Sequence, residues 1–120
     1  VKSLSSDLEL ITAISNDFDY SKIFSYQAES LCKKGDLLII ISSSGNSPNV
    51  VNLAKWAKKN KIFSISFTGF TGGKVKKYTN LNVHIDVNNY GLVEDSHHIL
   101  MHAIMHFIVR KYSSVKKLRL

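Results

Sequence analysis

The sequence predicts an α/β fold: a three-layer α/β/α sandwich with a parallel sheet, of the doubly wound, flavodoxin-like type. Short apolar runs of strand length alternate with longer segments of helical periodicity, which is typical of βαβ units. The segment 36–42 (DLLIIIS) has no polar alternation, as expected of a strand that helices cover on both faces. A length of 120 residues, with 44% hydrophobic and 21% charged residues, indicates one globular domain over residues 1–120 and excludes a disordered chain.

The first half of the chain opens with a predicted strand and a predicted helix. Residues 8–15 (LELITAIS) have the apolar character of a strand that needs cover on both faces. Asn16 and Asp17 then follow at the carboxyl end of that strand, where ligands collect in open α/β sheets, so they are candidate ligand-binding residues. Residues 20–34 place apolar side chains at helical spacing, and Gly35 is the expected C-terminal cap of that helix.

The second half continues the alternation. Residues 47–60 predict a helix with Pro48 at its first position, where the missing N–H costs nothing. The segments 61–67 and 81–87 are the third and fourth predicted strands, and a long final helix is expected over 94–109. Because single helices separate successive strands, the four strands are expected to run parallel.

Positive charge is concentrated in the second half of the chain. The net charge is +7, and residues 51–120 hold twelve Lys and Arg against three Asp and Glu. No helix-turn-helix, zinc-finger or aromatic–basic strand pattern accompanies this charge. We therefore interpret it as solvated helix ends and a basic tail over 110–120, and we expect no nucleic-acid partner. The main alternative that stays open is a surface for anionic metabolites, and a nucleic-acid-binding domain is a weaker one that a salt-dependent binding assay would identify.

The sequence also restricts the location of the protein. The longest uninterrupted apolar run, 37–41, is far shorter than a membrane span, so no membrane partner is expected. A single cysteine, Cys32, cannot form an internal disulfide and indicates a reducing, cytoplasmic compartment.

The most informative segment is the serine loop, residues 42–48 (SSSGNSP), between a predicted buried strand and a predicted helix. A helix N-terminus presents free backbone N–H groups and a positive dipole, which together favour an anion. Four hydroxyls add short donors: Ser42, Ser43, Ser44 and Ser47. No lysine or P-loop spacing is present, so one phosphate monoester is the expected ligand. The alternative is a serine-rich turn with an ordinary helix cap.

Histidines gather in the predicted final helix. His98, His102 and His106 recur every four residues and therefore lie along one helix face. Glu94 precedes His102 by two turns, and a carboxylate and an imidazole on one face are ligands for a divalent metal such as zinc. For His98 and His106 we prefer packed core histidines. Because 98–109 contains no fixed charge, we expect burial nearly all round and packing against other subunits.

Four stretches in order resemble one family. Residues 41–50 (ISSSGNSPNV) are similar to the sugar-phosphate loop of sugar isomerase (SIS) domains, and in particular to that of the phosphoheptose isomerase branch. Residues 15–18 (SNDF) and 68–74 (TGFTGGK) are similar to two further turns of that branch, and the start of its last helix resembles 94–102. The resemblance runs from about residue 3 to residue 109.

The resemblance implies a function and roles for named residues. It implies aldose–ketose isomerisation of sedoheptulose 7-phosphate to a heptose 7-phosphate through an enediol, feeding lipopolysaccharide or capsule synthesis. The four serines of the loop would bind the phosphate, and Asn16 and Asp17 would contact the sugar. His102 would be the acid/base and a zinc ligand, with Glu94 as co-ligand. The implied assembly is a cytoplasmic homotetramer.

The resemblance also has departures. The branch carries N-terminal helices, a first strand, a G-N-G-G-S-A loop and a helix that supplies a histidine and the glutamate base, and nothing here matches them. Because the chain opens on Val1, we expect a piece of a longer protein that is inactive by itself. Glu94 stands where the branch often has Gln. The alternative is a non-catalytic SIS module that binds sugar phosphates or serves as an oligomeric partner, and such a module need not keep Glu94 and His102.

Overall fold

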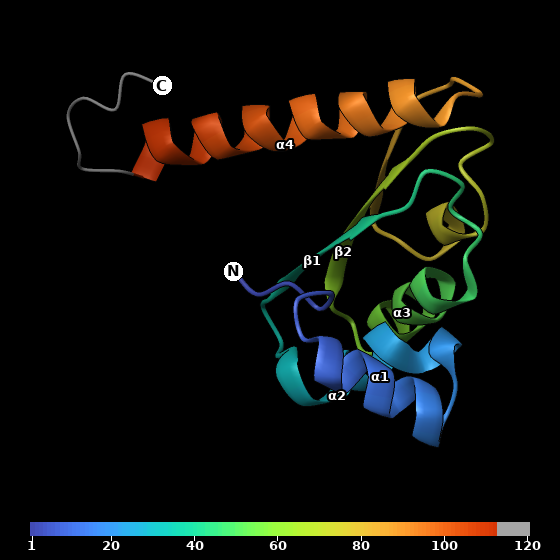
Figure 1. The fold of residues 1–120 in the computed structure, drawn as a ribbon. Helices are drawn as coiled ribbons and strands as arrows, with labels where there is room; N and C mark the ends of the chain where they lie inside the picture. The colour runs from blue at the N-terminus through green and yellow to red at the C-terminus, as the bar shows by residue number, and fades with distance from the viewer. Residues whose placement is uncertain (113–120) are drawn as a thin grey trace.

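The computed structural model describes residues 1–112 and has α/β architecture around a parallel three-stranded sheet (Figure 1). The strands lie in the order β1 (Leu37–Ile41), β2 (Phe63–Thr68) and β3 (Leu81–His84). The helices are α1 (Leu8–Asp17), α2 (Ile23–Leu31), α3 (Pro48–Lys59) and α4 (Tyr90–Tyr112), with short 3₁₀ turns η1 (Tyr20–Lys22) and η2 (Val75–Lys77). The predicted α/β class and parallel sheet are confirmed.

The expectation that residues 8–15 form a strand is wrong, because this segment is the helix α1. Asp7 caps the helix by accepting the backbone N–H of Leu10 at 3.0 Å. The hydroxyl of Ser15 donates to the carbonyl of Ile11, and Ile14 is the fully buried position of the helix. The sheet of residues 1–112 therefore has three strands instead of the predicted four.

The next predicted helix is shorter than expected. It divides into η1 and α2, and α2 ends at Leu31 with Cys32 as its C-cap. Gly35 is therefore not the helix cap. It lies in the turn that leads into β1, at a φ of +99°, where the carboxylate of Asp36 accepts the N–H of Lys33 at 2.8 Å.

Strand β1 is buried on one face only. Leu38 and Ile40 pack into the core with α3, whereas Leu37, Ile39 and Ile41 are exposed. In Figure 1, α1, α2 and α3 lie together on one side of the sheet, and the strands separate them from α4. The uninterrupted Leu and Ile run thus predicted the strand correctly but overestimated its cover within residues 1–112.

The core lies between the sheet and α3. Its buried members are apolar residues of α2, β1, α3 and the segments around them: Ala28, Leu38, Ile40, Val50, Leu53, Ala54, Ala57, Ile62 and Val75. Small alanines on α3 allow the helix to approach the sheet closely, and Lys58 and Lys59 occupy its last turn, where cations favour the helix dipole.

The α3-facing side of β2 is polar although it is fully buried. Ser64, Ser66 and Thr68 occupy alternate positions on this face. The amide of Asn82 on β3 donates to the hydroxyls of Ser66 and Thr68 at 2.8 and 2.9 Å. The side chain of Asn80 accepts the backbone N–H of Ser64 at 2.8 Å. The hydroxyl of Ser64 also donates to the side chain of Asn80 at 3.4 Å, so all three buried hydroxyls have a partner, as burial of polar groups requires.

Helix α4 extends beyond the sheet (Figure 1). Asn89 caps it by accepting the backbone N–H of Leu92 at 3.0 Å. Only Val93 and His97 are buried, whereas Phe107 is 60% and Ile108 50% exposed. The predicted all-round burial is thus not seen in the single chain.

Helix α4 also includes 110–112, which the sequence assigned to a basic tail, while 113–120 of that tail lie outside the described residues. Within residues 1–112, no helix combines the length and the apolar character needed to cross a membrane.

Candidate functional site

The serine loop connects the carboxyl end of β1 to the first turn of α3. Its start is fixed to the neighbouring strand, because Ser42 donates its N–H to the carbonyl of Phe67 at 3.0 Å. Gly45 turns the chain at a φ of +64° and donates its N–H to the hydroxyl of Ser42 at 3.2 Å. The hydroxyl of Ser44 accepts the N–H of Asn46 at 3.3 Å. The loop is thus held by its own hydroxyls in a compact arrangement.

A second loop, the glycine loop over 68–74, packs directly against the serine loop. Gly69 donates its N–H to the carbonyl of Ser43 at 2.7 Å. A Cβ at Gly73, whose φ is +59°, would overlap the carbonyls of Ser44 and Gly45. Glycine is therefore required there both by the backbone conformation and by the close approach of the two loops. The resemblance of residues 68–74 to a family motif thus has a structural reason.

The N-terminus of α3 is open to an anion. Ser47 occupies the N-cap position and Pro48 the first helical position, as predicted, but the Ser47 side chain makes no capping hydrogen bond to its own helix. Ser47 and Asn46 are exposed. Pro48 has no N–H, Val50 donates its N–H to the side chain of Asn49 at 2.8 Å, and Val51 donates its N–H to the carbonyl of Ser47 at 3.1 Å. A phosphate here would therefore receive the N–H of Asn49 and the free Ser47 hydroxyl.

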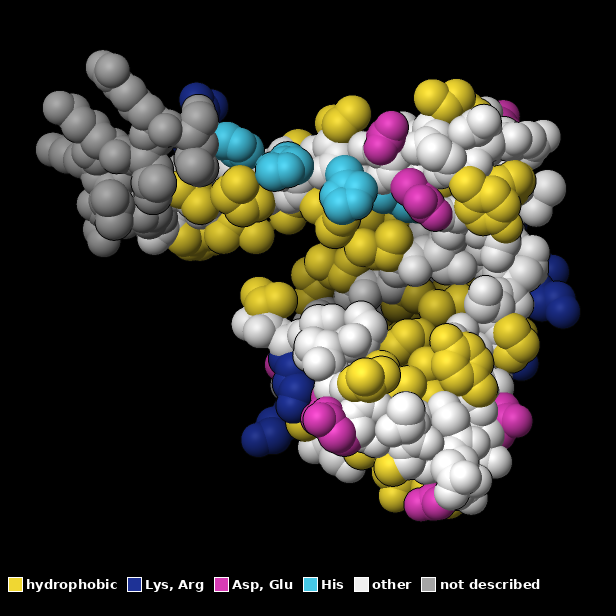
Figure 2. All heavy atoms as spheres, in the orientation of Figure 1, with side chains coloured by type: hydrophobic (Ala, Val, Ile, Leu, Met, Phe, Trp, Pro, Cys, Tyr) yellow, Lys and Arg dark blue, Asp and Glu magenta, His cyan; other side chains and the backbone are white. Residues whose placement is uncertain are grey.

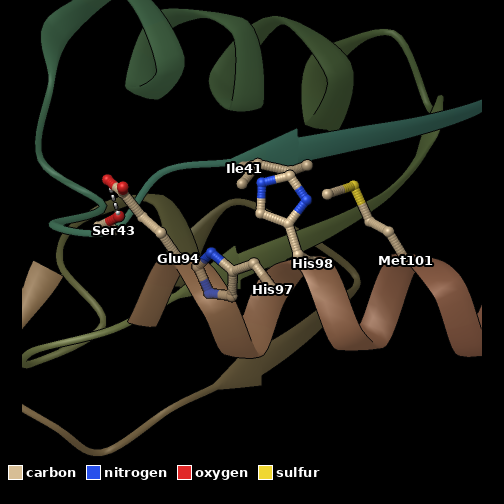
Figure 3. Close-up of a pocket in the computed structure, with 6 residues that line it drawn as sticks. All are labelled: Ile41, Ser43, Glu94, His97, His98 and Met101. Atoms are coloured by element: carbon tan, nitrogen blue, oxygen red, sulfur yellow. Dashed lines mark hydrogen bonds between the residues drawn. The ribbon is translucent and has the colours of Figure 1, made fainter. Parts of the chain in front are cut away.

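The structure brings the serine loop to the start of α4. The hydroxyl of Ser43 lies 3.5 Å from Oε1 of Glu94, across 51 positions of sequence. Beside this pair is a cavity of about 340 Å³ (Figure 3), lined by Ile41, Ser43, Glu94, His97, His98 and Met101. A cavity of this size accommodates a small phosphorylated metabolite. The predicted phosphate loop and the predicted metal carboxylate thus share one site.

His102 does not line this cavity. It lies on the exposed side of α4, two turns beyond Glu94, and Figure 2 shows histidines in a row along the surface of this helix. At a rise of about 1.5 Å per residue, the Cα atoms of Glu94 and His102 are about 12 Å apart along the helix axis. To bind one metal ion together, the two side chains would have to extend toward each other along the helix.

The metal prediction fits these residues only in part. A carboxylate and an imidazole are suitable zinc ligands, but zinc takes four ligands. Within residues 1–112, no group of three His, Cys, Asp or Glu side chains could hold an ion.

Asn16 and Asp17 do not lie where the sequence placed them. Both are exposed on the last turn of α1, and the side-chain amide of Asn16 donates to the carboxylate of Asp17 at 3.0 Å. The expected position at the carboxyl end of a strand is wrong because residues 8–15 are helical. Neither residue lines the cavity beside Glu94.

Two other titratable residues, Asp19 and Cys32, have pKa values that their surroundings shift. Asp19 is the N-cap of η1, and hydrogen bonds from the hydroxyl and backbone N–H of Ser21 hold its pKa below the ordinary value. Burial raises the pKa of the Cys32 thiol, with a smaller contribution from Asp36. A thiol with a raised pKa is a poor nucleophile, so Cys32 is not a candidate catalytic group.

The sequence analysis missed His97. This side chain is 2% exposed and lines the cavity, and its ring centroid lies 5.8 Å from that of Phe67. A signal was available: Val93, four residues earlier, is apolar, and residues i and i+4 share a helix face. The regular spacing of the other three histidines of α4 obscured the one that faces the sheet.

Comparisons with known proteins identify the family. Residues 2–94 match the family model described as the SIS domain. Over 111 residues the chain is 38% identical to a phosphoheptose isomerase of Aliarcobacter butzleri, covering 92% of this chain and 59% of that protein. A probable phosphoheptose isomerase of Thermoplasma acidophilum is 36% identical over 110 residues, covering 92% of this chain and 60% of that protein.

Solved structures agree with this result. A phosphoheptose isomerase from Francisella tularensis superposes with a TM-score of 0.86 at 27% identity, covering 90% of this chain and 58% of that one. A phosphoheptose isomerase from Neisseria gonorrhoeae also has a TM-score of 0.86, at 32% identity, covering 89% and 61%. The chain therefore spans about three fifths of the length of these relatives.

Proposed function

The chain belongs to the SIS domain family, and from this premise we propose that it is the phosphate-binding part of a phosphoheptose isomerase. The proposed reaction is the aldose–ketose isomerisation of sedoheptulose 7-phosphate to a heptose 7-phosphate. The observation that supports it best is the approach of Ser43 to Glu94, because it joins a phosphate loop to the helix that carries the proposed acid/base. The relatives named phosphoheptose isomerase support the same substrate.

In this proposal the serine loop holds the phosphate of the substrate. The N-terminus of α3 supplies the backbone N–H of Asn49, and Ser47 supplies a hydroxyl that its own helix does not use. Ser42, Ser43 and Ser44 complete the set of hydroxyls around the loop. Fixing the phosphate places the other end of the sugar at a constant distance, which aligns C1 and C2 with the catalytic groups.

The isomerisation moves a proton between C1 and C2 through an enediol. It needs a base, an acid and a group that stabilises the charge of the intermediate. We assign the acid/base role to His102. Glu94 is the one carboxylate on the lining of the cavity. If Glu94 holds a metal, the base that removes the carbon-bound proton must come from outside residues 1–112.

Zinc and oligomerisation are also parts of this proposal. Glu94 and His102 would provide two zinc ligands, and zinc, when bound, would stabilise negative charge on the substrate oxygens. A homotetramer would cover the exposed apolar residues of α4, among them Ile99, Phe107 and Ile108. The reaction would take place in the cytoplasm and supply heptose for lipopolysaccharide or capsule synthesis.

Calorimetry with sedoheptulose 7-phosphate and with unphosphorylated sedoheptulose tests the phosphate role. We expect strong preference for the phosphate ester, and loss of that preference in the double variant Ser44→Ala, Ser47→Ala. Ser30→Ala is the control, because Ser30 is an exposed serine on α2. Equal binding of the two sugars, or unchanged binding by the double variant, would contradict the proposal.

A second candidate is a non-catalytic SIS module that binds sugar phosphates. It is favoured by the single carboxylate on the cavity lining and by the missing third metal ligand within residues 1–112. The two candidates differ in the need for Glu94 and His102. A binding module does not need a zinc ligand or an acid/base, so replacing His102, which does not line the cavity, would leave its sugar-phosphate affinity unchanged.

A further inference from the structure

His97 is buried yet has no hydrogen-bond partner. Neither Nδ1 nor Nε2 contacts a donor or acceptor within residues 1–112, and the side chain is 2% exposed. A neutral imidazole has one N–H donor and one acceptor nitrogen, and burying them without partners is unfavourable. Buried polar groups of this kind call for an explanation, since most native ones are satisfied.

The surroundings of the ring explain why the chain itself offers no partner. Phe67 is its aromatic neighbour, and Ile41 and Met101 are apolar residues of the same cavity. An apolar residue at position 97 would suit these contacts at least as well as histidine. The polar nature of this side chain is therefore not accounted for by packing.

The ring lies at the site where a sugar would extend from the serine loop. Figure 3 shows His97 beside Glu94, whose carboxylate reaches Ser43. Both nitrogens are covered, and the contact that holds Glu94 in place is a long one of 3.5 Å to the Ser43 hydroxyl. The ring is nevertheless part of the cavity lining, beside Ser43 and Glu94.

We propose that His97 is a substrate-contacting residue that hydrogen-bonds a hydroxyl or carbonyl oxygen of the sugar whose phosphate occupies the serine loop. This inference rests on the proposed function, since it requires a sugar phosphate in this cavity. The polyol supplies both donors and acceptors, so it satisfies the ring that the protein leaves unsatisfied. Such a site rejects analogues that lack the matching oxygen, because they leave the buried nitrogens unpaired.

The test compares two ligands on the 120-residue chain: sedoheptulose 7-phosphate, which would reach His97, and inorganic phosphate, which would occupy the serine loop alone. We expect His97→Phe to weaken binding of the sugar phosphate by about 10- to 100-fold. Its affinity for inorganic phosphate should stay within about twofold of the wild-type value, because no hydrogen bond to phosphate is removed. His97→Gln, which keeps a donor and an acceptor, should restore most of the sugar-phosphate affinity. His106→Gln is the control on the same helix outside the cavity lining.

Two further measurements separate a ligand contact from a structural role. Because the unpaired nitrogens are removed, His97→Phe should unfold at the same or a higher temperature than wild type. In the wild-type chain labelled with ¹⁵N-histidine, the His97 ring signals should shift with sedoheptulose 7-phosphate and not with inorganic phosphate. The labelling experiment needs no variant, so it decides the question even if His97→Phe does not fold.

The outcomes distinguish the two proposals. If wild type binds the sugar phosphate and His97→Phe binds it equally well, or the His97 signals do not move, the role of His97 is wrong while the proposed function stands. A lower unfolding temperature together with equal loss of both ligands would indicate a structural histidine and would also overturn it. If wild type binds no sugar phosphate, the proposed function fails and this inference fails with it.

Discussion

The side chain of Asn46 accepts the backbone N–H of Lys74 at 3.0 Å, and this bond joins the serine loop to the glycine loop. The carbonyl of Gly45 accepts the N–H of Val75 at 3.0 Å beside it. The two loops therefore form one unit at the carboxyl ends of β1 and β2, and the geometry of the phosphate site depends on both.

The substitution Asn46→Asp should separate folding from phosphate binding. The new carboxylate keeps an acceptor for the N–H of Lys74 but loses the amide N–H that donates to the carbonyl of Ser44 at 3.2 Å, so the free energy of unfolding should fall by only about 1 kcal/mol. Its negative charge lies next to the N-terminus of α3, so the affinity for inorganic phosphate should fall about tenfold or more at low salt. Urea denaturation and calorimetry measure the two effects. Unchanged phosphate affinity would place the anion elsewhere.

Replacing Gly73 by Ala should be costly, because its φ is +59° and the added Cβ would overlap the carbonyls of Ser44 and Gly45. We expect a loss of about 2–4 kcal/mol in the free energy of unfolding, together with weaker phosphate binding. Gly35→Ala is the matched control, since Gly35 also has a positive φ of +99° but open space around it. It should cost about 1 kcal/mol and leave phosphate binding intact. Equal costs at both positions would show that the contact between the loops is unimportant.

Zinc titration tests the proposed ligand pair. Glu94→Ala and His102→Ala should each weaken zinc binding by about tenfold or more. His106→Ala should leave it unchanged, because His106 is not part of the pair. If His106→Ala weakens binding as much as His102→Ala, while Glu94→Ala does not, the ion is held by the two neighbouring histidines instead.

Light scattering tests the assembly. We expect a discrete oligomer, in the proposed case a tetramer, because Phe107 and Ile108 are 60% and 50% exposed on α4. The double variant Phe107→Ser, Ile108→Ser should dissociate it, whereas Tyr112→Ser, at the last position of the helix, should not. A wild-type monomer at micromolar concentration would contradict the prediction.

Turnover by residues 1–120 alone should be at least about 10²–10⁴-fold below that of a full-length phosphoheptose isomerase, because Glu94 is the one carboxylate on the cavity lining and we assign it to the metal. The measurement follows the conversion of sedoheptulose 7-phosphate by the chain and by the Aliarcobacter butzleri relative as the reference. Comparable rates would make Glu94 the catalytic base and remove it from the proposed zinc site.

Local signals predicted much of the fold correctly. The Ile run of β1 and Pro48 at the start of α3 each define an element without reference to the rest of the chain. Residues 8–15 were predicted wrongly, because their apolar positions fit both helical and strand periodicity. The signal that identifies a helix is its N-cap residue, Asp7. Mistaking this helix for a strand also misplaced Asn16 and Asp17, since their predicted role depended on a strand end.

The candidate site likewise has one part that could be predicted from the sequence and another that could not. The serine loop could be predicted because its residues are contiguous. The Ser43–Glu94 contact could not, since it spans 51 positions and depends on how α4 crosses the sheet. The exposure of α4 could not be predicted either. A helix without charged residues is expected to be buried, but its sequence does not tell whether its own chain or another subunit covers it.

The buried hydroxyls of β2 have a consequence for the accuracy of the whole site. Because side chains alternate between the faces of a sheet, slipping β3 by one residue would turn Asn82 toward the opposite face and leave Ser66 and Thr68 without their donor. Misalignment would therefore remove the acceptors of the Asn82 amide and one donor from each of the two hydroxyls. Only the short segment 85–89 separates β3 from α4. The pairing of Asn82 with Ser66 and Thr68 therefore fixes where α4 starts and keeps Glu94 opposite Ser43.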